Sequence, residues 1–178
     1  MPQQKEAAAA SQETEPVPVV VFLHGYGGSA GQVLNNQALG RALTRRGYAV
    51  IAPQGLRRDG EGPRSWSFGP FSGGRDEVAF LDQVLADAVA RFGVSSTRTV
   101  LAGFSAGAFM VHYLACAAPQ GFAAYAPVAG AFWQPQPDSC AGPGRLSRRG
   151  NVLRCISCPR LPRGLPPVPC EAKPSGVP

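Results

Sequence analysis

A serine held between two glycines constrains this chain more than any other short stretch of its sequence. The segment "LAGFSAGAFM" contains Gly103-Phe104-Ser105-Ala106-Gly107, a G-x-S-x-G pattern that places a serine on a tight turn between a strand and a helix. A β-type run, "TRTVLAGF", precedes Ser105, and a helix-forming run, "AGAFMVHYLACAA", follows it. Both flanks therefore match the pattern, which predicts Ser105 as a nucleophile. A glycine-rich turn without chemistry is the alternative.

Strand and helix patterns alternate along the body of the chain. Apolar or β-branched runs predict strands at Val17–Leu23, Tyr48–Pro53, Thr99–Phe104 and Phe122–Val128, and helical patterns cover 31–47, 75–93 and 106–118. Glycine and proline in 57–74 predict a loop. Strict alternation predicts an α/β fold of the doubly wound type, with a mostly parallel sheet and Ser105 at its carboxyl edge beside Gly25–Tyr26.

The segment 75–93 has the clearest helical pattern in the chain. One apolar stripe is formed by Val78, Leu81, Leu85, Ala88 and Phe92. Asp76 and Glu77 stand where negative charge favours the positive end of a helix, and Gly93 is a stop signal. The pattern predicts a surface helix with this stripe against the sheet.

A His-Gly turn follows the first predicted strand in "LHGYGG". Backbone N–H groups at such a turn can face an oxyanion that forms next to Ser105. His24 has two interpretations, because its ring can brace the turn by hydrogen bonds or act as a general base. We favour bracing, since hydrolases with a G-x-S-x-G turn place their base after the nucleophile in chain order.

Several of these segments together resemble one group of α/β-hydrolases. "VVVFLHGYGGSAG", "RSWSF", "VLAGFSAGAFMVHYLACAAPQGFAAYAPVAG" and "PDSC" are similar to the polyhydroxybutyrate depolymerase and feruloyl esterase-like group, over about Val17 to Cys140. The resemblance implies a serine ester hydrolase, with Ser105 as nucleophile and the N–H groups of Tyr26 and Ala106 as oxyanion hole. It also implies a small-molecule or polymeric ester as substrate and export in many members.

The sequence departs from the group after "PDSC", where members continue with a strand, the triad Asp and a final His. Beyond Ser105 the one histidine is His112, about 10 Å along the helix from Ser105 and directed away from it. The acids beyond Ser105 are Asp138, which has the setting of a turn residue, and Glu171. We therefore expect a serine ester hydrolase that is impaired by the loss of its triad acid and base. The alternative is a catalytically inactive fragment or binding module with the same fold.

Composition changes sharply after Cys140. Residues 1–140 hold ten Lys/Arg and ten Asp/Glu, whereas 141–178 hold seven and one, so the tail carries the whole net charge of +6. We predict three parts: a disordered lead-in at 1–16, a partial hydrolase domain at 17–140, and a basic, disordered tail at 141–178. Its Arg, Pro, Gly and Cys are typical of a GC-rich gene read in a shifted frame. A truncation or frameshift near Gly142–Gly144 would remove the triad acid and base together.

Other functions of the tail have weaker support. Cys155 and Cys158, flanked by Cys140 and Cys170, have part of a zinc-site spacing, but their outer spacing follows no zinc pattern. Basic residues without interleaved aromatics favour a solvated tail over nucleic-acid binding. We therefore predict no metal, no cofactor and no nucleic-acid partner. The sequence shows no apolar run of membrane-span length and no signal peptide, so a cytoplasmic chain without disulfides is expected as written.

Overall fold

A parallel sheet forms the centre of the computed structural model, which describes residues 15–57, 60–68, 74–119, 121–132 and 140–141. Its strands β1 (Val17–Leu23), β2 (Ala49–Ile51), β5 (Val94–Phe104) and β6 (Ala124–Val128) lie in the order β2-β1-β5-β6. Every neighbouring pair is parallel, and the register sets Leu23 opposite Gly103 and Phe104 opposite Val128. The carboxyl ends of β1, β5 and β6 therefore meet at one edge, which confirms the predicted α/β sheet.

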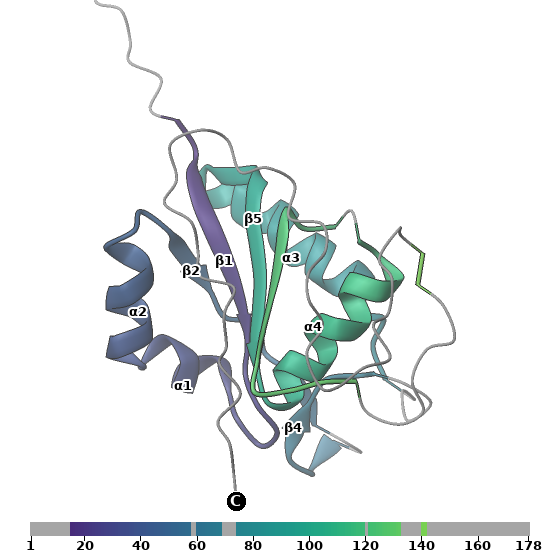
Figure 1. The fold of residues 1–178 in the computed structure, drawn as a ribbon. Coiled ribbons are helices and arrows are strands. Elements are labelled where there is room, and N and C mark those ends of the chain that lie inside the picture. The colour runs from purple at the N-terminus through teal and green to yellow at the C-terminus, as the bar shows by residue number, and fades with distance from the viewer. Residues whose placement is uncertain (1–14, 58–59, 69–73, 120, 133–139, 142–178) are drawn as a thin grey trace, which may run out of the picture.

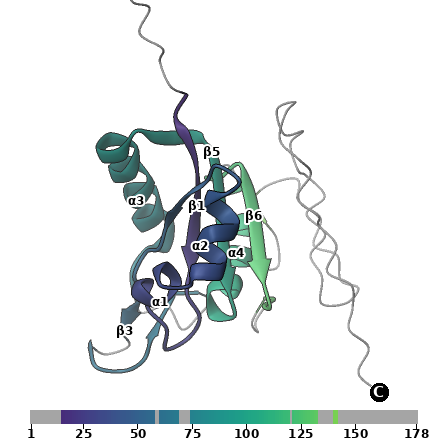
Figure 2. The same ribbon diagram turned by 90° about the vertical axis from the view of Figure 1, so that its left-hand side faces the viewer.

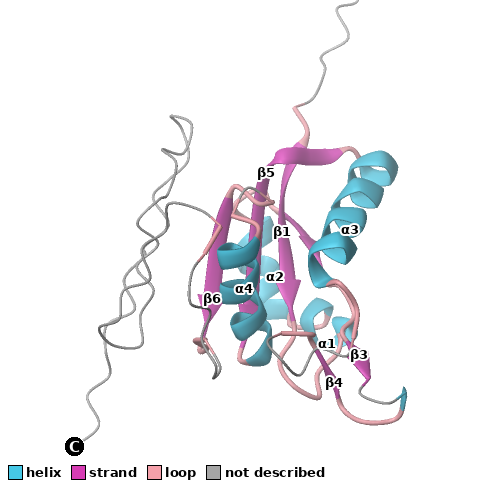
Figure 3. Cartoon of the chain, turned by 90° about the vertical axis from the view of Figure 1, so that its right-hand side faces the viewer, coloured by secondary structure: helices cyan, strands magenta, loops and turns pink. Residues whose placement is uncertain are grey.

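Helices cover both faces of this sheet. Figure 1 shows α1 (Ala30–Leu34) and α2 (Gln37–Thr44) on one side, with α3 (Glu77–Phe92) and α4 (Ala106–Ala117) on the other. The first pair lies in front of the sheet in Figure 2, whereas α4 lies in front of it in Figure 3. This is the doubly wound arrangement that the alternating pattern predicts.

The prediction of one helix over 31–47 is wrong, because the chain breaks at Asn35–Asn36. The side chain of Asn36 accepts a hydrogen bond from the Leu39 N–H at 3.1 Å and so begins a second helix, α2. Asparagine is a good N-cap because its side chain satisfies a free N–H of the first turn. The side chain of Ser29 begins α1 in the same way, by accepting from the Gln32 N–H.

Helix α3 agrees with its prediction except at its last turn. Asp76 caps it by accepting from the Ala79 N–H at 3.1 Å, and Gly93 ends it with a left-handed φ of 63°. Leu81 is buried within the predicted stripe. Phe92 is 70% exposed, so its predicted core position is wrong. It stands at the end of the helix, where the Arg91 guanidinium lies 5.2 Å from its ring centre instead.

The segment predicted as a loop contains both regular and buried structure. Strands β3 (Leu56–Arg57) and β4 (Arg64–Ser65) form a short antiparallel hairpin. Trp66 follows it and is only 5% exposed. The glycines and prolines therefore predicted the turns of this segment correctly, but the loop prediction failed to identify Trp66 as a core residue.

The main core lies between the sheet and the α3–α4 layer. Its fully or nearly buried members are Val21, Leu23, Trp66, Leu81, Leu101, Met110, Val111, Leu114 and Phe122. A smaller cluster at the other end of the sheet is formed by Val19, Ala88 and Val94. These side chains come from the runs that the sequence patterns selected, apart from Trp66 and Val94.

Several predictions concern residues that lie outside the described part of the chain. These are most of the lead-in at 1–16, the tail from residue 142 onward, Asp138, Glu171, Cys155, Cys158 and Cys170. The three-part division of the chain and the shifted reading frame therefore stay predictions. Within the described residues, no helix combines the length and the apolar character needed to cross a membrane.

Candidate active site

Ser105 lies in a strained turn at the carboxyl end of β5. Its φ of 54° and ψ of −115° are unusual for a residue with a side chain, and such a conformation costs of order 1–3 kcal/mol. Two backbone hydrogen bonds hold it, from the Ser105 N–H to the Val128 oxygen and from the Phe109 N–H to the Ser105 oxygen, each 3.0 Å long. Its side chain forms no capping bond to α4, which begins at the next residue.

The glycines around Ser105 are required by close backbone contacts. A Cβ on Gly103 would lie 2.5 Å from the carbonyl carbon and oxygen of Gly107. A Cβ on Gly107 would lie 2.3 Å from the Leu23 oxygen. Neither distance is tolerated by a real side chain. Because only glycine fits at both positions, the structure supplies the physical reason for the G-x-S-x-G pattern.

The His-Gly turn lies directly beside Ser105. A Cβ on Gly25 would be 3.5 Å from the Ser105 Cβ, which agrees with the predicted juxtaposition. The Gly28 N–H donates to the Gly25 oxygen at 3.0 Å across a turn that requires the φ of 70° at Gly27. The exposed Tyr26 projects from the tip of this turn.

Two backbone N–H groups remain available next to Ser105. Among the described residues, neither the Tyr26 N–H nor the Ala106 N–H donates a hydrogen bond to another group of the chain. Ala106 is also the first residue of α4, where the helix dipole is positive. An oxyanion hole formed by these two groups stays a prediction.

His24 is buried and its two ring nitrogens are both engaged. Nδ1 lies 2.8 Å from the Gly25 oxygen, which can only accept, so Nδ1 carries the proton. Nε2 accepts from the Gly55 N–H at 3.0 Å and from the Gln54 side-chain amide at 3.2 Å. The Gln54 amide oxygen in turn accepts from the Ala30 N–H, which leaves its nitrogen to face His24. These contacts are those of the bracing interpretation.

Neither histidine of the chain has the setting of a general base for Ser105. Burial lowers the pKa of His24 below the ordinary value of 6.5, and the positive charge of Arg64 lowers it further. His112 is 6% exposed and its Nε2 donates to the Gly130 oxygen at 3.1 Å. Burial lowers its pKa as well. The chain has only these two histidines, so its own imidazoles serve packing and bracing.

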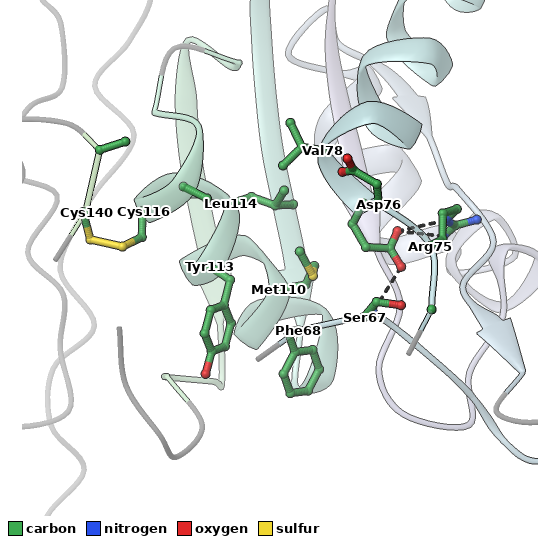
Figure 4. Close-up of a pocket in the computed structure, with 14 residues that line it drawn as sticks. Ser67, Phe68, Arg75, Asp76, Val78, Met110, Tyr113, Leu114, Cys116 and Cys140 are labelled. Carbon is green, nitrogen blue, oxygen red and sulfur yellow. Dashed lines mark hydrogen bonds and ion pairs between the residues drawn. A yellow bond between two sulfur atoms is a disulfide. The ribbon is translucent and has the colours of Figure 1, made fainter. Parts of the chain in front are cut away.

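One hollow among the described residues lies away from Ser105. It measures about 720 Å³ and is bounded by Phe68, Met110 and Tyr113 on one side and the polar start of α3 on the other (Figure 4). The Phe68 and Tyr113 rings stack with centres 5.7 Å apart. Ser105 is not part of its lining. The candidate active site is therefore the carboxyl edge of the sheet, where the nucleophile candidate is.

A disulfide joins α4 to the end of the described chain. Cys116 is bonded to Cys140, and the Ala141 N–H donates to the Cys116 oxygen at 2.8 Å (Figure 4). The bond engages Cys140, which was an outer ligand only in the weakly supported zinc alternative. It also departs from the expectation that disulfides are disfavoured in this chain. Sequence reasoning missed Cys116 because it lies 24 positions from Cys140, and that spacing belongs to no recognisable cysteine pattern.

The residues that brace His24 were also missed by sequence reasoning. Gln54 was part of a strand boundary, and Trp66 was part of a loop. The available signal was a tryptophan inside a glycine-rich and proline-rich stretch, since so large an apolar side chain is rarely left in solvent.

Several solved structures have a fold similar to that of this chain. The chain is similar to the S-formylglutathione hydrolase FrmB of Staphylococcus aureus, with 18% identity, a TM-score of 0.51, and coverage of 69% of this chain and 46% of that one. FphF, a fluorophosphonate-binding serine hydrolase of the same organism, has 18% identity and a TM-score of 0.52, with coverage of 71% of this chain and 48% of that one. The acetyl xylan esterase of Aspergillus awamori has 19% identity and a TM-score of 0.51, with coverage of 63% of this chain and 41% of that one.

The chain spans less than half the length of each of these structures, and at such identities the likeness concerns the fold alone. No curated protein matches it. The sequence model of the family described as esterase PHB depolymerase matches residues 7–151, which is most of the chain. Together with the parallel sheet and the Ser105 turn, this match shows that the chain belongs to the esterase PHB depolymerase family and has the α/β-hydrolase fold.

Proposed function

We propose that the Ser105 site is that of a serine carboxylic-ester hydrolase that works through an acyl-enzyme. The observation that carries the proposal is the strained conformation of Ser105. Its side chain makes no capping bond to α4, and it lies beside the Tyr26 and Ala106 N–H groups, which have no partner among the described residues. Strain of this kind persists where the surrounding structure holds it in place, and it is common at active sites. Membership of an esterase family supports the same chemistry.

The proposed reaction begins with attack of the Ser105 Oγ on the ester carbonyl carbon. The carbonyl oxygen becomes an oxyanion, which accepts hydrogen bonds from the Tyr26 and Ala106 N–H groups. The bond from the carbonyl carbon to the alcohol oxygen then breaks, and a base carries the proton from the Ser105 hydroxyl to the departing alcohol. Water hydrolyses the acyl-enzyme, which releases the acid and restores the Ser105 hydroxyl. One such donor accelerates the reaction by about 10²–10³-fold, so both are expected to matter.

The substrate we propose is a polyhydroxybutyrate-type or feruloyl-type ester. The family match supports the first, and the group that the sequence resembles includes the second. The surface next to Ser105 is apolar, since Tyr26, Phe104 and Val128 are 69%, 51% and 48% exposed. Such a surface suits the hydrocarbon part of an ester better than a charged metabolite.

A second candidate is an α/β-hydrolase without turnover that acts as a binding module. It is favoured by one observation, the engagement of both histidines in hydrogen bonds away from Ser105. A serine hydroxyl without a base is a poor nucleophile. The two candidates therefore differ in whether Ser105 is acylated once a base is supplied.

Imidazole added to the solution can supply that base. We expect p-nitrophenyl acetate to acylate Ser105 slowly in buffer and faster in imidazole, as measured by peptide mass spectrometry. Ser105→Ala should abolish the adduct. Ser96→Ala is the matched control, because Ser96 is an exposed serine in the opposite half of β5, and it should leave the adduct unchanged. No imidazole-dependent adduct on Ser105 would favour the binding module.

A further inference from the structure

One buried carboxylate, that of Glu77, is the starting point of two hydrogen-bonded arms that reach His24. Glu77 is 3% exposed. Its Oε1 accepts from the Ser67 N–H at 3.1 Å, and its Oε2 accepts from Nε and Nη2 of Arg75 at 3.1 and 2.8 Å. The dashed lines at Ser67 and Arg75 in Figure 4 mark these contacts.

The first arm runs through the backbone to Trp66. Because Glu77 holds the N–H of Ser67, it fixes the chain next to Trp66. The Trp66 indole N–H donates to the His24 backbone oxygen at 2.8 Å, and the two rings have centres 5.0 Å apart. This arm therefore controls where the His24 backbone leaves β1.

The second arm runs through Arg75 to the His24 ring. Both terminal nitrogens of Arg75 donate to the Gln54 backbone oxygen, at 3.4 Å each, and its guanidinium lies 3.3 Å from the Phe80 ring centre. The Gln54 side-chain amide donates to Nε2 of His24. This arm adds a second donor to Nε2, beside the Gly55 N–H at 3.0 Å, and so helps to hold the His24 ring in place.

Helix capping does not account for the burial of Glu77. Asp76 already caps α3, so the helix start has its acceptor without Glu77. Burying a charged pair costs several kcal/mol of desolvation, and well-packed apolar side chains are often at least as stabilising. An apolar residue at position 77 would, however, accept neither from Ser67 nor from Arg75.

We infer that Glu77 is a positioning residue for the candidate oxyanion hole. Through Trp66 and Gln54 it sets the place of His24, whose Nδ1–H holds the Gly25 oxygen and so the turn that presents the Tyr26 N–H. The catalytic meaning of this inference rests on the proposed function. The positioning of His24 itself does not, and it can be measured without any substrate.

The test is the ¹⁵N spectrum of the histidine rings in the full-length chain. Wild type should show His24 with a protonated Nδ1 and an unprotonated Nε2. In Glu77→Gln, one of the two acceptor oxygens becomes an NH₂ group, which can only donate. It then faces either the Ser67 N–H or the Arg75 guanidinium, both of which are donors, so one of the two arms is broken. We expect the ¹⁵N signals of the His24 ring to shift and the Gly25 and Tyr26 amide signals to move. Asp82→Asn is the matched control, since Asp82 is an exposed acid of the same helix, and it should change neither.

Unchanged His24 signals in folded Glu77→Gln would overturn the inference. If that variant does not fold, Gln54→Ala decides, because it keeps the Glu77–Arg75 pair and removes the contact to Nε2. Unchanged His24 signals in Gln54→Ala would overturn the inference equally. Ser105 acylation in imidazole should also fall about tenfold in Glu77→Gln, as expected for a displaced oxyanion donor. A wild-type chain that is never acylated contradicts the proposed function alone, since the His24 signals still test the positioning.

Discussion

A methyl group on Gly107 would lie 2.3 Å from the carbonyl oxygen of Leu23, so the first turn of α4 packs directly against the end of β1. Leu23 is followed by His24 and Gly25, and Gly107 follows Ser105 by two residues. This contact therefore brings the nucleophile candidate and the His-Gly turn to the same place. The site depends on the absence of a side chain at least as much as on the side chains present.

The contact between Gly107 and Leu23 predicts a large effect of one added methyl group. Gly107→Ala should lower the free energy of unfolding by about 1–3 kcal/mol, because the backbone atoms it meets cannot turn aside. Gly40→Ala is the matched control, since Gly40 lies inside α2 with no atom within 4 Å of an added Cβ. It should stabilise the protein by about 0.5–1 kcal/mol in urea unfolding. Equal effects of the two substitutions would contradict the packing described here.

The disulfide between Cys116 and Cys140 predicts a redox-dependent stability. Closing a loop of 24 residues stabilises a protein by about 3 kcal/mol through the unfolded state. Cys116→Ser should therefore lower the free energy of unfolding by about that amount. A reducing agent should do the same to wild type and add nothing in the variant. A wild-type chain whose unfolding ignores the reducing agent would show that the bond does not form in solution.

The engagement of both histidines predicts feeble turnover in buffer without imidazole. Oxyanion donors and binding alone can retain roughly 10³–10⁴-fold acceleration over water when a triad member is missing. Hydrolysis of a p-nitrophenyl ester should be slow, and Ser105→Ala should change it little. His24→Ala is the informative companion if the wild type proves briskly active. A loss of activity that added imidazole restores would identify His24 as a base, whereas a loss that imidazole does not restore is the loss of the brace.

The lowered pKa values of His24 and His112 predict a loss of stability in mild acid. Both groups bind protons less readily when folded than when unfolded, so protons favour unfolding as the pH falls below 6.5. The free energy of unfolding should fall as the pH is lowered below 6.5, with a slope that corresponds to the uptake of at most one proton by each histidine on unfolding. Just above pH 6.5 the two histidines should leave it constant. His112→Gln, whose amide can still donate to Gly130, should reduce the slope in urea titrations at each pH. A flat profile below 6.5 would rule out this account of the histidines.

Much of the candidate site was predictable because its signals are local. The glycines at 103 and 107, the strand before Ser105 and the helix after it all lie within one continuous stretch. Each follows from short-range sterics or from periodicity. The break at Asn35–Asn36 was also local in origin, but a run of helix formers on both sides concealed the cap.

The remaining parts depend on contacts between distant segments. Phe92 lies on the same face of α3 as Leu81, but helical periodicity does not reveal that the last turn of α3 extends beyond the core. Cys140 seemed to belong with the cysteines of the tail, whereas its partner is in α4.

The sequence by itself determined the alternation of strands and helices, the parallel sheet and the strained turn at Ser105, because backbone sterics and side-chain period act over a few residues. Only the tertiary structure decided what surrounds His24. Two of its partners are Gln54 and Trp66, and Glu77 holds both in place through Arg75 and Ser67. These residues come from segments that no sequence spacing relates to His24. A buried hydrogen bond is chosen by which groups folding brings within about 3 Å of each other, and that proximity is a property of the packed chain.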